Sequence, residues 1–158
     1  YFPVGAALMG EKVADVFENS NSPEAGIFHG YTYSAHPVGA AAVCACLSET
    51  QRISTKDNAG VRGKQLYEGI LKLKNKFNII GDVRGGQGLM AAIEVVSDQK
   101  KKTAMSMDEM KKLHQSTYEA GAMVRLGLNN ILMSPPLVIS EAEIDQILNA
   151  LDYGFSSM

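Results

Sequence analysis

Tryptophan is absent from this 158-residue sequence, cysteine occurs only twice, and aromatic residues make up only 7 % of the chain. No apolar run approaches the ~20 residues that a membrane-spanning helix needs. The longest block of consecutive basic residues, 100–102, is too short to indicate a nucleic-acid partner and is typical of a solvated loop. The sequence therefore predicts neither a membrane protein nor a nucleic-acid-binding protein.

The scarcity of metal-binding and disulfide-forming residues also limits the possible chemistry. Cys44 and Cys46 are spaced C-x-C in an alanine-rich run, which suits neither a thioredoxin-like pair nor a zinc site. We expect both to be small buried residues of a helix, and free thiols fit a reducing cytoplasm. Neither His29 nor His36 has a second ligand at a suitable spacing, so no metal site is predicted.

What is present is the balance of an ordinary globular protein, with 46 % hydrophobic residues, 20 % charged residues and a net charge of -2. In the first third, residues 11–18 indicate a short helix and residues 27–35 an irregular segment. Pro37 can begin a helix that continues through Glu49. This second helix is apolar nearly all round, which predicts that it is buried.

The remainder alternates helices and strands, each with one polar face, and predicts an α+β unit of two or three strands beginning near residue 52. A helix is expected over 58–76. Two more are expected after Ser106 and after Ser140, because each of these serines precedes a glutamate by three residues, as in a capping box. Extended pieces are expected within 79–96 and around 123–125 and 131–133.

Three features could carry chemistry. In residues 29–37 (HGYTYSAHP), a glycine, hydroxyls and a following helix N-terminus suit a phosphate, but hydroxyls before helices are usually caps. The glycines of residues 84–88 precede a strand rather than a helix, so they indicate a turn rather than a nucleotide-binding loop. Arg125 lies among apolar residues and needs a partner, either a protein carboxylate or a substrate carboxylate.

The order of four motifs resembles that of the class III aminotransferases, the family of the omega-transaminases. Residues 1–6 (YFPVGA) and 11–13 (EKV) are similar to the stretch after that family's cofactor lysine. Residues 29–37 are similar to its H-G-[YF]-T-[YF]-S-[GA]-H-P segment. The series is completed by 82–90 (DVRGGQGLM) and by Arg125, which is followed ten residues on by Pro135, Pro136 and Leu137.

This resemblance implies site residues for pyridoxal 5'-phosphate (PLP) and substrate. Thr32, with the backbone around Tyr31, would bind the PLP phosphate in the neighbouring subunit's site of a homodimer. Arg125 matches a mobile arginine that grips the carboxylate of an amino-acid or keto-acid substrate and swings aside for substrates without one. The resemblance assigns no catalytic residue to this chain.

The implied fold is the α/β type I fold of PLP-dependent transferases. Residues 1–52 would end the large PLP-binding domain, and residues 53–158 would form the small C-terminal α+β domain. The Schiff-base lysine would lie about six residues before Tyr1. Because the sequence also begins without methionine, we expect a fragment that is inactive alone.

The implied reaction moves an amino group from an amine or omega-amino acid to a keto acid such as pyruvate. Two alternatives stay open. The chain could be a non-catalytic stand-alone module or pseudo-enzyme subunit, or the parent could be an aminomutase or decarboxylase of the same fold.

Overall fold

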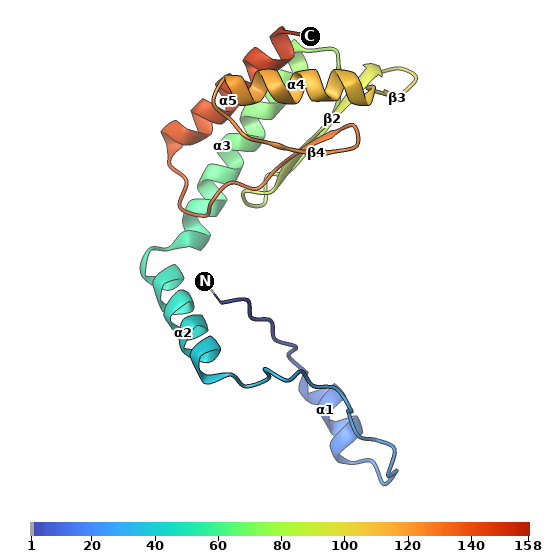
Figure 1. The fold of residues 1–158 in the computed structure, drawn as a ribbon, viewed down its shortest axis with the longest axis vertical. Helices are drawn as coiled ribbons and strands as arrows, with labels where there is room; N and C mark the ends of the chain where they lie inside the picture. The colour runs from blue at the N-terminus through green and yellow to red at the C-terminus, as the bar shows by residue number, and fades with distance from the viewer. Residues whose placement is uncertain (1) are drawn as a thin grey trace. The chain divides into compact units, whose positions relative to one another are not determined.

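The computed structural model describes residues 2–158, which divide into two units with the boundary between Arg52 and Ile53. The first unit contains α1 (Glu11–Glu18) and α2 (Pro37–Arg52), joined by a segment without helix or strand (Figure 1). Both predicted helices and the irregular segment between them are confirmed, although α2 ends at Arg52 rather than Glu49.

The predicted burial of α2 is wrong for this unit. Gly39 is its only buried residue, Leu47 is 59 % exposed, and Cys44 and Cys46 are exposed as well. The physical reason is that the described residues of the first unit include no strand, so α2 has no sheet to cover its apolar side chains.

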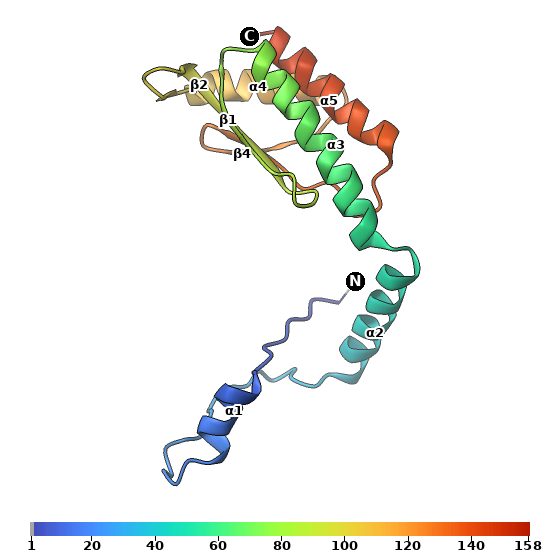
Figure 2. The ribbon, with the colours of Figure 1, turned by 180° about the vertical axis from the view of Figure 1, so that it is seen from behind.

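The second unit is an antiparallel sheet with helices on one face (Figures 1 and 2). Its strand order is β1-β2-β5-β4, with β3 paired to β2, so the expected two or three strands were too few. The elements, in chain order, are α3 (Thr55–Lys76), β1 (Ile80–Arg84), β2 (Ala91–Asp98), β3 (Thr103–Ala104), α4 (Met107–Glu119), β4 (Arg125–Gly127), β5 (Asn130–Met133) and α5 (Glu141–Ser156).

The core lies between the sheet and these helices. Alternate strand residues such as Ile93 and Ile131 point into it, and both are fully buried. The helices contribute one face each, as the spacing of their apolar residues predicts, with these side chains buried: Leu66, Ile70 and Leu73 of α3, Met110 and Leu113 of α4, and Ile144, Leu151 and Phe155 of α5.

Both predicted capping boxes are present. Ser106 accepts a hydrogen bond from the Glu109 amide, and the Glu109 side chain accepts one from the Ser106 amide. Ser140 and Glu143 repeat this pattern at the start of α5. The pKa of each glutamate is lowered by the hydrogen bond from its serine hydroxyl. These boxes fix the starts of the two helices that flank the β4–β5 hairpin in the sequence.

Candidate functional site

Arg125 stands at the start of β4 on the sheet face opposite the helices. Its Cα partner on β5 is Leu132, and the alternating neighbour Leu126 packs against the core. The Arg125 side chain is exposed and has no ion pair or hydrogen bond to any residue that the structure describes. Of the two partners predicted for it, the protein carboxylate is therefore not found within residues 2–158.

Arg125 lies between two cavities. One of about 420 Å³ is bounded by Pro135, Pro136 and Ile139 on the side of α5. The other, of about 280 Å³, is bounded by Arg84, Ala92 and Leu132 on the sheet face opposite the helices, which we call the open sheet face. Arg125 is among the residues that line both cavities. On the sheet face opposite the helices, its guanidinium can hold a carboxylate, because few groups there compete for its donors.

The predicted phosphate segment forms a turn in the first unit. Tyr31 N–H donates to Ser34 Oγ at 3.1 Å, and Ser34 N–H donates to the Tyr31 carbonyl at 2.9 Å. Tyr31 is 75 % exposed and its ring meets His29 edge-on at 5.0 Å between centroids. The turn therefore uses both backbone groups of Tyr31 internally.

In this turn, Thr32 keeps its hydrogen-bonding groups available to a ligand. Its hydroxyl and amide have no hydrogen-bond partner in the described part of the chain. A Cβ on Gly30 would meet no atom within 4 Å, so the space beside this glycine is open. The Thr32 hydroxyl can therefore donate one hydrogen bond to a phosphate oxygen. The Tyr31 amide is not free to be a second donor, because it already donates to Ser34 Oγ.

His36 determines how this turn enters α2. Its Nδ1 accepts a hydrogen bond of 3.2 Å from Gly39 N–H, which caps the helix that Pro37 begins. The Phe2 ring stacks on His36 at 5.1 Å. These two rings help to line a cavity of about 310 Å³, whose walls also include Val4 and Tyr31. Tyr31 lines this cavity, and Thr32 does not.

The predicted residues thus occupy two places. Tyr31 and Thr32 are neighbours in the first unit, whereas Arg125 belongs to the second.

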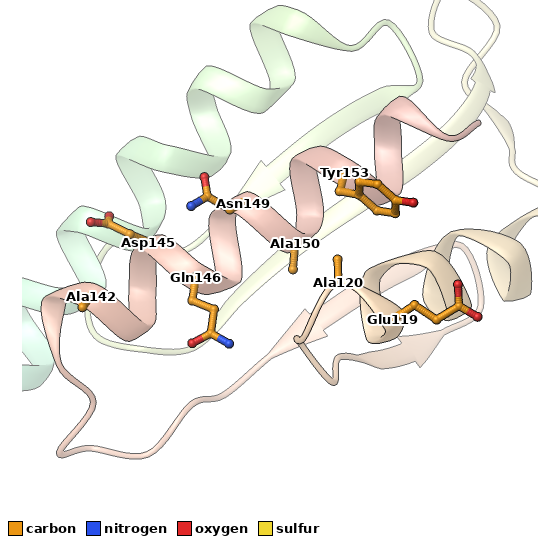
Figure 3. A pocket seen from close by; sticks show the side chains of 8 residues that line it. All are labelled: Glu119, Ala120, Ala142, Asp145, Gln146, Asn149, Ala150 and Tyr153. Carbon is orange, nitrogen blue, oxygen red and sulfur yellow. The ribbon is translucent and has the colours of Figure 1, made fainter.

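A fourth cavity, of about 560 Å³, lies between the end of α4 and α5 (Figure 3). Ala120 and Ala150 face each other across it, while Asp145 points away, where its Oδ1 accepts a hydrogen bond from Gln65 at 2.8 Å. Glu119 and Asp145 are its charged residues. Two carboxylates without a cation are unsuited to a phosphate or a carboxylate ligand.

No lysine of the described chain has the burial of an imine-forming residue. Lys74 is the least exposed, and its Nζ donates to Asp82 Oδ1 at 3.2 Å. That hydrogen bond lowers the pKa of Asp82, and Arg84, with Nη1 at 3.9 Å, adds a smaller effect in the same direction. The half-buried Lys74 amine is therefore paired with a carboxylate rather than enclosed in an apolar pocket.

Arg84 was not among the candidate residues predicted from the sequence. Residues 84–88 were predicted only to form a glycine turn, and that turn is confirmed, with φ of +153°, +94° and +132° at Gly85, Gly86 and Gly88. The sequence signal that could have indicated Arg84 is the alternation in β1. Because Val83 is buried, the next residue, Arg84, points to the face opposite the core.

The family model and the relatives that match this sequence are all aminotransferases. The family model described as aminotransferase class-III matches residues 2–153. An uncharacterised aminotransferase of Sinorhizobium fredii is 35 % identical over 94 % of this chain and 32 % of its own length. The taurine–pyruvate aminotransferase of Bilophila wadsworthia is 30 % identical over 100 % of this chain and 36 % of its own length.

Solved structures agree. The crystal structure of an amine transaminase from an uncultivated Pseudomonas species, in its PLP-bound form, superposes with a TM-score of 0.87 and 33 % identity. The match covers 93 % of this chain and 33 % of that one. The chain therefore has part of the fold of the PLP-dependent transaminases and spans about a third of the length of these relatives. Among the described helices, none combines the length and apolar character needed to cross a membrane.

Proposed function

This chain belongs to the class III aminotransferase family, and on that premise we propose that it supplies binding residues to a PLP-dependent transaminase. The enzyme that contains it would move an amino group from an amine or omega-amino acid to a keto acid such as pyruvate. The taurine–pyruvate aminotransferase among its relatives supports this choice of acceptor. We further propose that the enzyme is a cytoplasmic homodimer, with residues 1–52 in its large domain and 53–158 in its small domain.

The observation that carries the proposal is Arg125, a cation without a protein partner among the described residues and beside two mainly apolar cavities. An exposed guanidinium on a rigid strand can grip a carboxylate through two parallel hydrogen bonds. Apolar walls such as Pro135 and Leu132 exclude water and strengthen that contact. The second cavity supports the expectation that Arg125 turns aside for substrates that lack a carboxylate.

Thr32 would contribute to holding PLP by donating its hydroxyl to the phosphate. When bound, PLP supplies the electron sink that stabilises negative charge on the substrate carbon. The task of this chain's residues is to fix both molecules: Thr32 acts on the cofactor phosphate, and Arg125 orients the substrate carboxylate. Orientation of this kind contributes to rate by reducing the entropy lost on reaching the transition state.

The experiment supplies the enzyme that contains this chain with PLP, an amine donor and pyruvate, and follows the products by NMR. We expect alanine and the donor's carbonyl product in equal amounts, with no reaction when PLP is withheld. Release of carbon dioxide would instead indicate a decarboxylase, and an isomerised amino acid would indicate an aminomutase. No turnover with any donor would support the non-catalytic alternative.

A further inference from the structure

We propose that His114 of α4 is a positioning residue for Arg125, which it holds in place through a hydrogen bond to the Val124 carbonyl. His114 touches no substrate itself; it fixes the backbone from which the Arg125 side chain extends. This role rests on the proposed function of Arg125 as a carboxylate anchor and deepens it, because it names a residue that determines how strongly the site prefers substrates with a carboxylate.

The contact joins a helix to the peptide that carries the arginine. His114 Nε2 lies 2.9 Å from the Val124 carbonyl oxygen. A carbonyl oxygen can only accept a hydrogen bond, so Nε2 carries the proton and donates it. The Val124 carbonyl belongs to the peptide group that links Val124 to Arg125. The hydrogen bond therefore fixes the plane of that peptide directly.

Arg125 stands where the sheet holds its backbone least firmly. β4 has only three residues and is the last strand in the order β1-β2-β5-β4. Its pairing with β5 runs from Arg125 to Gly127, so Arg125 is the first paired residue and Val124 lies outside the pairing. The ends of short edge strands open easily, because few hydrogen bonds hold them. A second attachment is needed to present the guanidinium in one place.

The helix that bears His114 is a rigid base for this attachment. His114 follows Met110 by four residues and precedes Thr117 by three, and both of these are fully buried, so the three share the packed side of α4. The Thr117 carbonyl accepts a hydrogen bond of 3.2 Å from Ala122 N–H. The connecting segment 122–124 is therefore tied to α4 at both of its ends.

His114 acts on a ligand only through the backbone. It lines neither of the two cavities that Arg125 lines. It also has no further hydrogen bond or ion pair in the part of the chain that the structure describes. Displacement of an anchoring group slows a reaction because the substrate is no longer oriented for it. Loss of the hydrogen bond should therefore affect only those substrates that Arg125 holds.

The test is the amine half-reaction of the PLP-loaded enzyme that contains this chain, with L-alanine and with isopropylamine, in which a methyl group replaces the carboxylate of alanine. His114→Phe keeps a ring and removes the donor. We expect the second-order rate constant for alanine to fall about fivefold, the equivalent of one hydrogen bond, and that for isopropylamine to change less than about twofold. His114→Gln keeps an N–H within reach of Val124 and should restore most of the alanine rate. Gln115→Leu, which removes a hydrogen bond of α4 to Glu119 instead, should alter neither rate.

Arg125→Met separates the role of His114 from that of Arg125, with Lys111→Met on the exposed side of α4 as the control of equal charge change. If Arg125→Met slows alanine alone while His114→Phe leaves the ratio of the two rate constants unchanged, the positioning role is overturned and the role of Arg125 stands. If Arg125→Met slows both substrates equally, the proposed carboxylate site is itself wrong.

Failure of His114→Gln to restore the alanine rate also overturns the proposal, because the ring rather than the hydrogen bond would then matter. Thermal unfolding shows whether each variant is folded. If His114→Phe does not fold, His114→Asn, whose shorter side chain does not reach Val124, takes its place with the same expected results.

Discussion

Arg84 Nη2 donates a 2.6 Å hydrogen bond to Asn130 Oδ1, which ties the end of β1 to the hairpin that carries Arg125. Asn130 Nδ2 in turn donates to the Gly127 carbonyl at 3.3 Å, across that same hairpin. Asn130 is half-buried and thus couples one arginine of the open sheet face to the strand of the other.

Replacement of Asn130 by alanine should therefore lower the free energy of unfolding by about 1–2 kcal/mol, because it removes a hydrogen bond to a charged group. Asn130→Asp keeps the acceptor and should recover most of the loss. Urea denaturation measures both. Asn149→Ala on α5, where the described residues offer the amide no partner, is the control and should stay within about 0.5 kcal/mol of wild type.

Two glycines of α3 should respond to alanine with opposite signs. A Cβ on Gly63 would collide with the Gly88 carbonyl, whereas one on Gly60 would meet no atom within 4 Å. Gly63→Ala should cost about 1–3 kcal/mol through overpacking, and Gly60→Ala should stabilise by up to about 1 kcal/mol through helix propensity. Equal effects at the two sites would contradict the close approach of α3 to the β1–β2 turn.

Acid should weaken the contribution of Asp82 to the free energy of unfolding. Its pKa in the folded chain is lowered, chiefly by the hydrogen bond from Lys74. A lowered folded pKa gives stability that is present above the unfolded value of about 3.9 and is lost as the pH falls through the folded value. Asp82→Asn should be less stable than wild type near pH 7, and the difference should vanish at low pH and shrink in high salt. A difference that persists at low pH would indicate another role for this side chain.

The Thr32 hydroxyl should matter to cofactor retention. In the enzyme that contains this chain, Thr32→Val should weaken PLP binding by about 1–2 kcal/mol, the value of one hydrogen bond to a charged group. Thr32→Ser keeps the hydroxyl and should bind PLP nearly as wild type does. Equilibrium dialysis against PLP measures the three constants, and identical values would remove Thr32 from the phosphate site.

Features that depend on neighbouring residues could be predicted from the sequence. The starts of α4 and α5 follow from the Ser106 and Ser140 capping boxes, and the buried face of α3 follows from the spacing of its leucines and isoleucine. The alternation in β2 indicates only that Ile93 and Val95 point to one face and Val96 to the other, and it does not say which face is buried. In the structure all three are buried.

Features that depend on pairing between distant residues could not be predicted. β3 has only two residues and becomes a strand because Ala104 pairs with Val96 of β2. The strand order, which brings β4 to the far side of β5, is likewise not encoded in any local pattern. The placement of Arg84 and Arg125 beside one cavity follows from that order, so the sequence indicated Arg125 alone.

The most direct test of the account is the single-turnover reaction of the PLP-loaded enzyme that contains this chain with L-alanine and with an amine that lacks a carboxylate. Arg125→Met should slow the reaction with alanine by about 2–4 kcal/mol, roughly 30- to 1,000-fold, and should change the reaction with the amine less than about twofold. Lys111→Met should leave both rates unchanged. Equal losses with the two substrates would contradict a carboxylate anchor and would make Arg125 a structural residue.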